Sequence, residues 1–294
     1  MMRTPSAWAV AIRRPDGRIT TVVEDARSVA LRYPMLRWPF IRGVVALGES
    51  LVIGMKALSL AARLSSTDHE EVAEDGVDGE ISKKEIMIAL VVAVVFSIAF
   101  FKVVPTVIAN FLPVDDTFAF VLIEGLIRVG LFISYLVFLS FLPDLRRVFQ
   151  FHSAEHMAIN ALEQGAPRTA AAAAGYSRIH LRCGTAFLLW VMVIAIIVFA
   201  FVGRPDLVWL IASRILLVPV IAGAAYEVIR VASRYDSHPI VHGILWPGLM
   251  LQRLTTRPAE LEHLEVAVAA LDAVLLREET NRAARAEAPI DVMA

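Results

Sequence analysis

The sequence predicts an all-α polytopic membrane protein with about four transmembrane helices, an interfacial amphipathic helix, a small N-terminal β-hairpin and cytoplasmic helices. The chain of 294 residues is 57% hydrophobic and has a mean hydropathy of +0.65, far above a soluble domain of ordinary composition. Four stretches reach the length of roughly 20 residues that a helix needs to cross a bilayer. These stretches are Ile86–Leu112, Thr117–Leu142, Gly184–Val202 and Leu207–Ile229. A lipid bilayer is therefore the expected partner.

Residues 1–38 are expected to form a cytoplasmic segment containing a β-hairpin. Trp8–Arg13 and Ile19–Glu24 are strand-like runs on either side of Arg14-Pro15-Asp16-Gly17. In such a turn proline presets φ and glycine permits a positive φ, so the two runs should pair as antiparallel strands.

Residues 39–64 are expected to form an amphipathic helix that lies in the membrane interface or is half inserted. Polar residues recur every seven positions in an otherwise apolar stretch, at Arg42, Glu49, Lys56 and Arg63. This spacing gives one narrow polar stripe along a helix. An acidic, flexible linker is expected at 65–85, since Ser65–Glu80 has little to bury.

The remaining chain alternates between membrane hairpins and cytoplasmic segments. We expect a first transmembrane hairpin at 86–142, a cytoplasmic segment at 143–183 and a second hairpin at 184–229. Residues 230–294 should form a cytoplasmic helical segment. Within it, apolar residues at intervals of three and four, starting at Leu261, predict a short amphipathic helix that docks on the cytoplasmic domain or on a second copy of the chain.

The distribution of arginine and lysine predicts the orientation in the membrane. Basic residues are frequent before the first span and between the second and third spans, whereas the loop around Asp115 contains neither arginine nor lysine. Loops rich in these residues remain in the cytoplasm. The pattern favours a multi-pass protein of the cell inner (plasma) membrane with both termini cytoplasmic.

Composition also excludes some classes of function. A net charge of −1 and the absence of a basic stretch interleaved with aromatic residues argue against nucleic acid as a partner. The single cysteine, Cys183, rules out an intrachain disulfide. A homo-oligomer is compatible with the sequence, and the substrate is not indicated.

The segment between the two hairpins contains an H-x-x-E-H pattern formed by His152, Glu155 and His156. On a helix, histidines at i and i+4 project from one face, a spacing suited to two imidazole ligands on one tetrahedral metal. Glu155 lies beside that face and could take a proton from a metal-bound water. This order of residues is the signature of the inverted zinc metallopeptidases. The competing interpretation is an amphipathic helix whose polar residues face water.

Further ligand types lie downstream. His180 and Cys183 form an H-x-x-C pattern immediately before the third span, and His180 is the preferred third ligand of Zn²⁺ or another divalent transition metal. Glu227 corresponds in chain order to the third ligand of the inverted zinc peptidases. Competing interpretations are a helix cap or a contact with a lipid headgroup for His180 and a small buried residue for Cys183.

Two other pairs of polar residues are interpreted as structural. Glu124 and Arg128 lie four residues apart within a span and are expected to neutralise each other. His238 and His242 have the same spacing, but Pro239 between them argues against an uninterrupted helix, so no site is assigned there.

Several segments together resemble the YqhQ-like bacterial membrane proteins, a family of unestablished function that has been described as a predicted metal-dependent enzyme. The resemblance covers nearly the whole chain and rests on MMRTPSAWAVAIRRPDG, PFIRGVVALGESLVIGMKALSLAA, FHSAEHMAINALEQG, HLRCGTAFLL and LWPGLMLQRLTTRPAELEHLEVAV. It implies a polytopic inner-membrane protein in which His152, Glu155, His156, His180 and Cys183 form a shared polar cluster. The family more often has other residues at Ser153, Met157 and Leu181, and its pattern usually begins with a glycine-rich segment before Met-Met-Arg.

Two functions follow as hypotheses. The first is a metal-dependent hydrolase at the cytoplasmic membrane face, in which His152 and His156 hold zinc together with His180 or Glu227, and Glu155 acts as general base. The alternative is a membrane scaffold or transporter in which the same cluster is a structural metal site or a polar network.

Overall fold

The computed structural model describes residues 1–26, 28–66, 83–181, 183–235 and 238–287. Most of the predicted acidic linker at 65–85 lies outside these residues. The chain divides into two compact units. We call Met1–His69, Leu142–Leu181 and Leu249–Ala294 the sheet unit, and Glu70–Phe141 and Arg182–Gly248 the span unit. The mostly helical fold with a small N-terminal sheet agrees with the sequence-based prediction.

The sheet unit is built on three antiparallel strands in the order β1-β2-β3: β1 (Met2–Arg3), β2 (Ala7–Arg13) and β3 (Ile19–Asp25). The predicted hairpin is confirmed, since β2 pairs with β3. In its turn, the Gly17 N–H donates to the Arg14 carbonyl oxygen at 2.9 Å, and Gly17 has a φ of +85°, which glycine adopts without steric cost. Strand β1 is an addition, too short to show an alternating pattern in the sequence.

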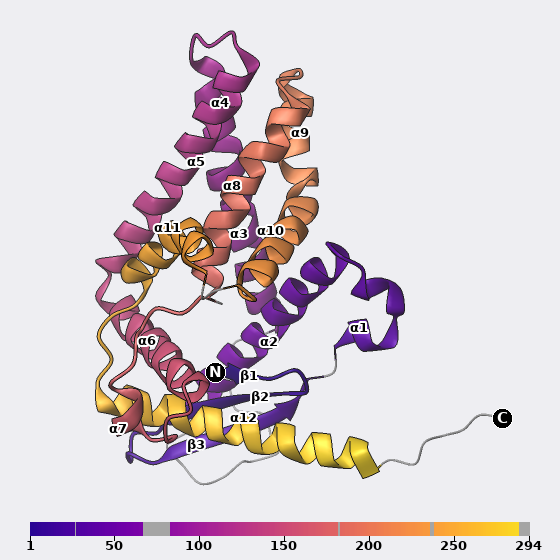
Figure 1. The fold of residues 1–294 in the computed structure, drawn as a ribbon. Coiled ribbons are helices and arrows are strands. Elements are labelled where there is room, and N and C mark those ends of the chain that lie inside the picture. Colours follow the sequence, from indigo (N-terminus) through magenta and orange to yellow (C-terminus); the bar gives the residue numbers. More distant parts are fainter. Residues whose placement is uncertain (27, 67–82, 182, 236–237, 288–294) are drawn as a thin grey trace, which may run out of the picture. The chain divides into compact units, whose positions relative to one another are not determined.

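Alternate residues of β2 pack against different helices. Ala7 and Ala9 join a buried cluster with α6 (Pro143–Glu163) and α12 (Leu261–Glu287). Trp8 and Val10 point the other way, as the period of two in a strand requires, and pack with Ala57 of α2 (Ile41–Ser66). Figure 1 shows α12 running along β2 and β3. Both faces of the strand are therefore covered.

The helix predicted from Leu261 is longer than expected. It continues to Glu287 as a helix of 27 residues, because its second half is rich in alanine, arginine and glutamate, which are strong helix formers. Its first half packs on α6, in agreement with docking on the segment that carries the H-x-x-E-H pattern. The other elements of the sheet unit are α1 (Val29–Arg32), the 3₁₀ helix η1 (Pro34–Arg37) and α7 (Ala170–Ala173). Helix α11 (Pro239–Thr255) passes from the span unit into the sheet unit.

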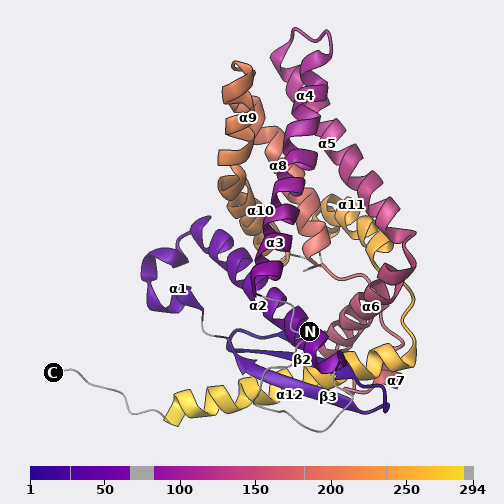
Figure 2. The same cartoon turned by 180° about the vertical axis from the view of Figure 1, so that it is seen from behind.

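The span unit contains the helices of the two predicted membrane hairpins (Figure 2). The first hairpin is formed by α3 (Lys83–Ile98), the π-helical turn η2 (Ala99–Val103), α4 (Val104–Phe111) and α5 (Thr117–Ser140). The second is formed by α8 (Gly184–Val202), α9 (Leu207–Leu216) and α10 (Val218–Ala232). Helices α5, α8 and α10 share a buried apolar cluster, so the hairpins pack on each other.

Four helices among the described residues are long and apolar enough to cross a membrane: Ile41–Ala61, Met87–Phe111, Thr117–Ser140 and Gly184–Val202. The first of these belongs to α2, which the sequence predicted as interfacial. The stretch predicted as a span at Leu207–Ile229 forms two helices, α9 and α10, which are bent by 42° with Leu217 between them. Pro219 in the first turn of α10 explains the break, because it has no N–H to continue the ladder of α9.

A buried charge network joins the two hairpins. Glu124 on α5 accepts from Arg128 at 2.5 Å and from the Nη2 of Arg214 on α9 at 2.7 Å. All three side chains are at most 2% exposed. The predicted pairing of Glu124 with Arg128 is confirmed, and Arg214 is an addition. Arg128 also donates to the carbonyl oxygen of Phe101 at 3.1 Å. In an α-helix this oxygen would accept from the residue four positions later, but that residue is Pro105, which has no N–H.

Candidate metal site

The candidate site is built on one face of α6 in the sheet unit. His152, His156, Asn160 and Glu163 follow one another at intervals of four, four and three residues, which places them along a single stripe of the helix. The helix starts at Pro143, whose fixed φ suits a first helical position. Its opposite, alanine-rich side is fixed by burial against α12 and the sheet, so the stripe faces the segment 177–181 and the end of α11.

Both histidines of the pattern are fixed through the same ring atom. His152 Nδ1 lies 2.9 Å from the carbonyl oxygen of Thr255, and His156 Nδ1 lies 2.7 Å from that of Arg178. A carbonyl only accepts, so each Nδ1 carries the proton and each Nε2 carries the lone pair that a metal uses. The two rings are 4.4 Å apart between centroids.

The separation of these histidines suits a shared ion. One ligand atom of each lies within 4.8 Å of the other. Two nitrogens at about 2.0–2.1 Å from one tetrahedral zinc lie about 3.4 Å apart, which is inside this limit. The donor types and their proximity therefore fit a divalent transition metal.

His180 lies next to this pair. Its ring centroid is 5.9 Å from that of His156, and its Nε2 is 3.3 Å from an Oε2 of Glu163. The main chain of His180 is held on both sides by the buried side chain of Gln252, which accepts from its N–H at 3.0 Å and donates to its carbonyl at 2.8 Å. The position of His180 is thus set by α11 as well as by α6.

Asn160 fastens the same segment to α6. Its Nδ2 donates to the carbonyls of Ser177 at 2.6 Å and Ile179 at 3.0 Å. Together with the contact from His156 to Arg178, these bonds hold the backbone that leads into His180.

Sequence reasoning missed three residues of this arrangement: Asn160, Glu163 and Gln252. The first two carried a usable signal, because they extend the i, i+4 stripe of His152 and His156 on the same helix. Gln252 carried none, since its partner lies 72 positions away in the chain.

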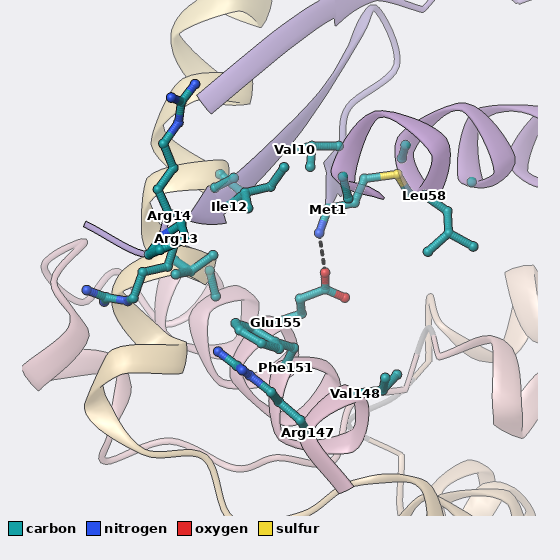
Figure 3. Close-up of a pocket in the computed structure, with 18 residues that line it drawn as sticks. Met1, Val10, Ile12, Arg13, Arg14, Leu58, Arg147, Val148, Phe151 and Glu155 are labelled. Carbon is teal, nitrogen blue, oxygen red and sulfur yellow. Dashed lines mark hydrogen bonds and ion pairs between the residues drawn. The ribbon is translucent and has the colours of Figure 1, made fainter. Parts of the chain in front are cut away.

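Glu155 points in a different direction from the two histidines. Its carboxylate forms an ion pair with the terminal ammonium of Met1 (Figure 3). It also lines a cavity whose described lining contains no histidine. About 30% of the Glu155 side chain remains exposed, so the carboxylate is accessible to water.

The other two candidate ligands belong to the span unit. Cys183 is the N-cap of α8, where its sulfur accepts from the N–H of Thr185 at 3.4 Å, and it is 7% exposed. Glu227 lies half-buried in α10. A ligand role for either residue stays a prediction.

His238 and His242, a pair to which the sequence assigned no site, lie at the start of α11. His242 is exposed on α11, and its N–H donates to the carbonyl of His238 at 3.0 Å. The helix begins at Pro239, so the proline between the two histidines starts α11 and does not interrupt it.

Comparison with known proteins places the chain in a family. Residues 38–277 match the family described as "Protein of unknown function (DUF1385)". The chain is also similar to "Uncharacterized protein YqhQ" of Bacillus subtilis (strain 168), with 32% identity over 278 residues that cover 91% of this chain and 86% of the relative. No solved structure matches the chain. The chain therefore belongs to the DUF1385 family, as its resemblance to the YqhQ-like proteins indicated.

Proposed function

We propose that this chain is a multi-pass inner-membrane protein with both termini cytoplasmic, and that it uses a bound divalent transition metal, best zinc, for hydrolysis at the cytoplasmic membrane face. One observation carries the metal assignment. His152 and His156 are both anchored through Nδ1 to backbone carbonyls, which is the outer-shell arrangement that orients imidazole ligands.

His180 is the third ligand in this proposal, and Glu163 orients it. A carboxylate on the remaining imidazole nitrogen of a ligand fixes the ring and raises its basicity. Cys183 and Glu227 are the alternative ligands. Cys183 follows His180 by three residues, which span at most about 11 Å.

Glu155 is the proposed general base. A bound zinc supplies a water whose pKa is close to neutral. Glu155 lies one position from His156 on the helix and is open to water, as a general base must be. The substrate in this proposal is a membrane-proximal peptide or a lipid-linked group.

A second candidate function is a scaffold or transporter with a structural metal site or polar network. The direction of Glu155 favours it, because the carboxylate lines a cavity that the histidines do not line. A closed set of four protein ligands would leave no position for a reacting water.

The test begins with metal content after purification in detergent without chelators. We expect wild-type protein to contain about one zinc per chain, and His152→Ala or His156→Ala to lose it, since each removes one of the paired imidazoles. His242→Ala is the matched control, because His242 lies on a helix four residues after another histidine but is exposed. Metal-free wild-type protein that takes up no zinc on reconstitution contradicts the proposal.

Glu155→Gln then separates the two functions. The amide keeps the shape of the side chain but accepts no proton, so a hydrolase retains its metal and fails to complement a deletion strain. Full complementation by metal-loaded Glu155→Gln protein excludes Glu155 as a base and favours the structural site. Loss of metal in this variant instead makes Glu155 a ligand.

A further inference from the structure

A cavity of about 710 Å³ lies within the sheet unit, on the side of α6 that bears Glu155. Residues from α2, from the end of β2 and its turn, and from α6 and α12 form its wall (Figure 3). Ligand pockets in proteins typically measure roughly 300–1,000 Å³, so this cavity is large enough for an organic ligand.

One wall of the cavity is apolar and belongs to a helix suited to the bilayer. Gly54, Ala57, Leu58 and Ala61 line it, all within the stretch Ile41–Ala61, which is apolar enough to cross a membrane. A Cβ placed on Gly54 would meet no atom within 4 Å. Gly54, Ala57 and Ala61 are small, so they leave open space along this wall of the cavity.

The charged part of the lining is mainly cationic. It contains three arginines, Arg13, Arg14 and Arg147, and a single carboxylate, that of Glu155. Arg13 is engaged by Glu265 at 2.5 Å. The described residues offer no carboxylate to Arg14 or Arg147, and the buried Nε of Arg14 has no hydrogen-bond partner there.

The two remaining arginines lie on different sides of the cavity. Figure 3 shows Arg14 at the hairpin turn and Arg147 beside Phe151. Arg147 is exposed, with its guanidinium 5.9 Å from the Phe151 ring centroid. A phosphate in the cavity that reached these guanidinium groups would receive charge-assisted hydrogen bonds, which planar guanidinium groups give to phosphates with good geometry.

We infer that this cavity binds an anionic phospholipid, with an acyl chain along the small residues of α2 and the phosphate at Arg14 and Arg147. The inference goes beyond the proposed metal chemistry and needs no metal. An apolar wall alone would accept any acyl chain, whereas arginines without carboxylate partners select for a negative headgroup.

The probe is fluorescently tagged phosphatidic acid titrated into the detergent-solubilised full chain, with tagged phosphatidylcholine as the zwitterionic comparison. We expect phosphatidic acid to bind at least roughly tenfold more tightly, and Arg14→Gln or Arg147→Gln each to weaken it by roughly tenfold without affecting phosphatidylcholine. Arg18→Gln is the matched control, since Arg18 lies in the same turn, is 84% exposed and does not line the cavity.

A second pair of variants tests the location. Gly54→Leu puts a side chain into the open space and should weaken phosphatidic acid binding by at least roughly tenfold through steric exclusion. Gly48→Leu is its control, since Gly48 also lies on α2 with open space at its Cβ but outside the cavity lining. Thermal melts check that both variants fold.

Three results would overturn the inference: equal binding of the two lipids, unchanged phosphatidic acid binding in Gly54→Leu, or full displacement of the lipid by millimolar inorganic phosphate, which would reveal a simple anion site. The metal proposal is tested separately in the same proteins. Lipid binding should persist in His152→Ala, and zinc content should persist in Gly54→Leu.

Discussion

Glu278 connects the last helix to the first strands. Its Oε2 accepts from the Ser6 N–H at 3.0 Å and from the Ser6 hydroxyl at 2.5 Å. The hydrogen bond from the Ser6 hydroxyl, the largest favourable influence, keeps the pKa of Glu278 below its ordinary value of 4.5, since it stabilises the charged form.

This shift makes the stability of the sheet unit depend on pH. A carboxyl whose pKa is lowered by folding stabilises the fold fully above its ordinary pKa, and this contribution is lost as the pH falls through the folded-state value. We expect Glu278→Gln to lower the melting temperature at pH 7, with the difference from wild type shrinking below pH 4.5. Thermal melts of detergent-purified protein, recorded between pH 3.5 and 7 in steps of about half a pH unit, measure this difference in melting temperature.

Glu279→Gln serves as the control for that series, because Glu279 is the exposed neighbour of Glu278 on α12. A constant difference between wild type and Glu278→Gln across the whole pH range would contradict the assignment.

At the residue scale, sequence reasoning singled out His152 and His156 by helical periodicity and His180 by its separate H-x-x-C pattern, and their role as ligands stays a prediction. It did not identify Gln252, which holds His180 from another helix. Such contacts depend on how distant segments pack, and one sequence does not encode that packing in any local pattern.

At the scale of elements, Glu124 has a different role from its two partners. It is the carboxylate between Arg128 on its own helix and Arg214 on α9. Replacing Glu124 leaves two buried guanidinium groups without a counter-ion, whereas replacing Arg214 leaves one matched ion pair.

We therefore expect Glu124→Gln to destabilise the protein more than Arg214→Met does. Breaking a buried pair by removing one partner costs about 3–5 kcal/mol, and Glu124→Gln removes the shared partner of two cations. Melting temperatures in detergent compare the variants, with the exposed Arg234→Met as control. Equal losses for Glu124→Gln and Arg214→Met would argue against this division of roles.

Element boundaries were predicted well where the cause is local. The hairpin followed from Arg14-Pro15-Asp16-Gly17, and the lengths of the spans followed from hydropathy. The bend between α9 and α10 was missed although Pro219 is visible in the sequence, since transmembrane helices often tolerate proline when neighbours bond the freed groups. The part that Arg214 plays in the charge network was not predicted, because its contact with Glu124 depends on how the two hairpins pack.

For the whole molecule, the number of helices that cross the bilayer sets the topology. The described residues contain four long apolar helices, or five spans if α9 and α10 count as one. The N-terminal sheet shares a buried core with α6, and α3, α4 and α5 lie between them in the chain. If the first hairpin crosses the membrane twice, α2 therefore does not cross.

Cysteine labelling on a Cys183→Ser background distinguishes the arrangements. With α2 in the interface and four spans, a membrane-impermeant maleimide should label Asp115→Cys from outside intact cells and should reach Asp16→Cys and Gln164→Cys only after permeabilisation. Labelling of Asp16→Cys from outside would show that α2 crosses. Labelling of Asp115→Cys from the cytoplasmic side alone would overturn the orientation.

The sheet unit draws its core from both ends and the middle of the chain, and this has a consequence for biosynthesis. Ala154, Ala158 and Ala161 of α6 are buried against Leu264 and Leu271 of α12. During translation the segment bearing His152 and His156 therefore emerges more than a hundred residues before its apolar cover. The candidate metal site is completed only when synthesis is nearly finished, so a nascent or truncated chain exposes α6 to chaperones and proteases.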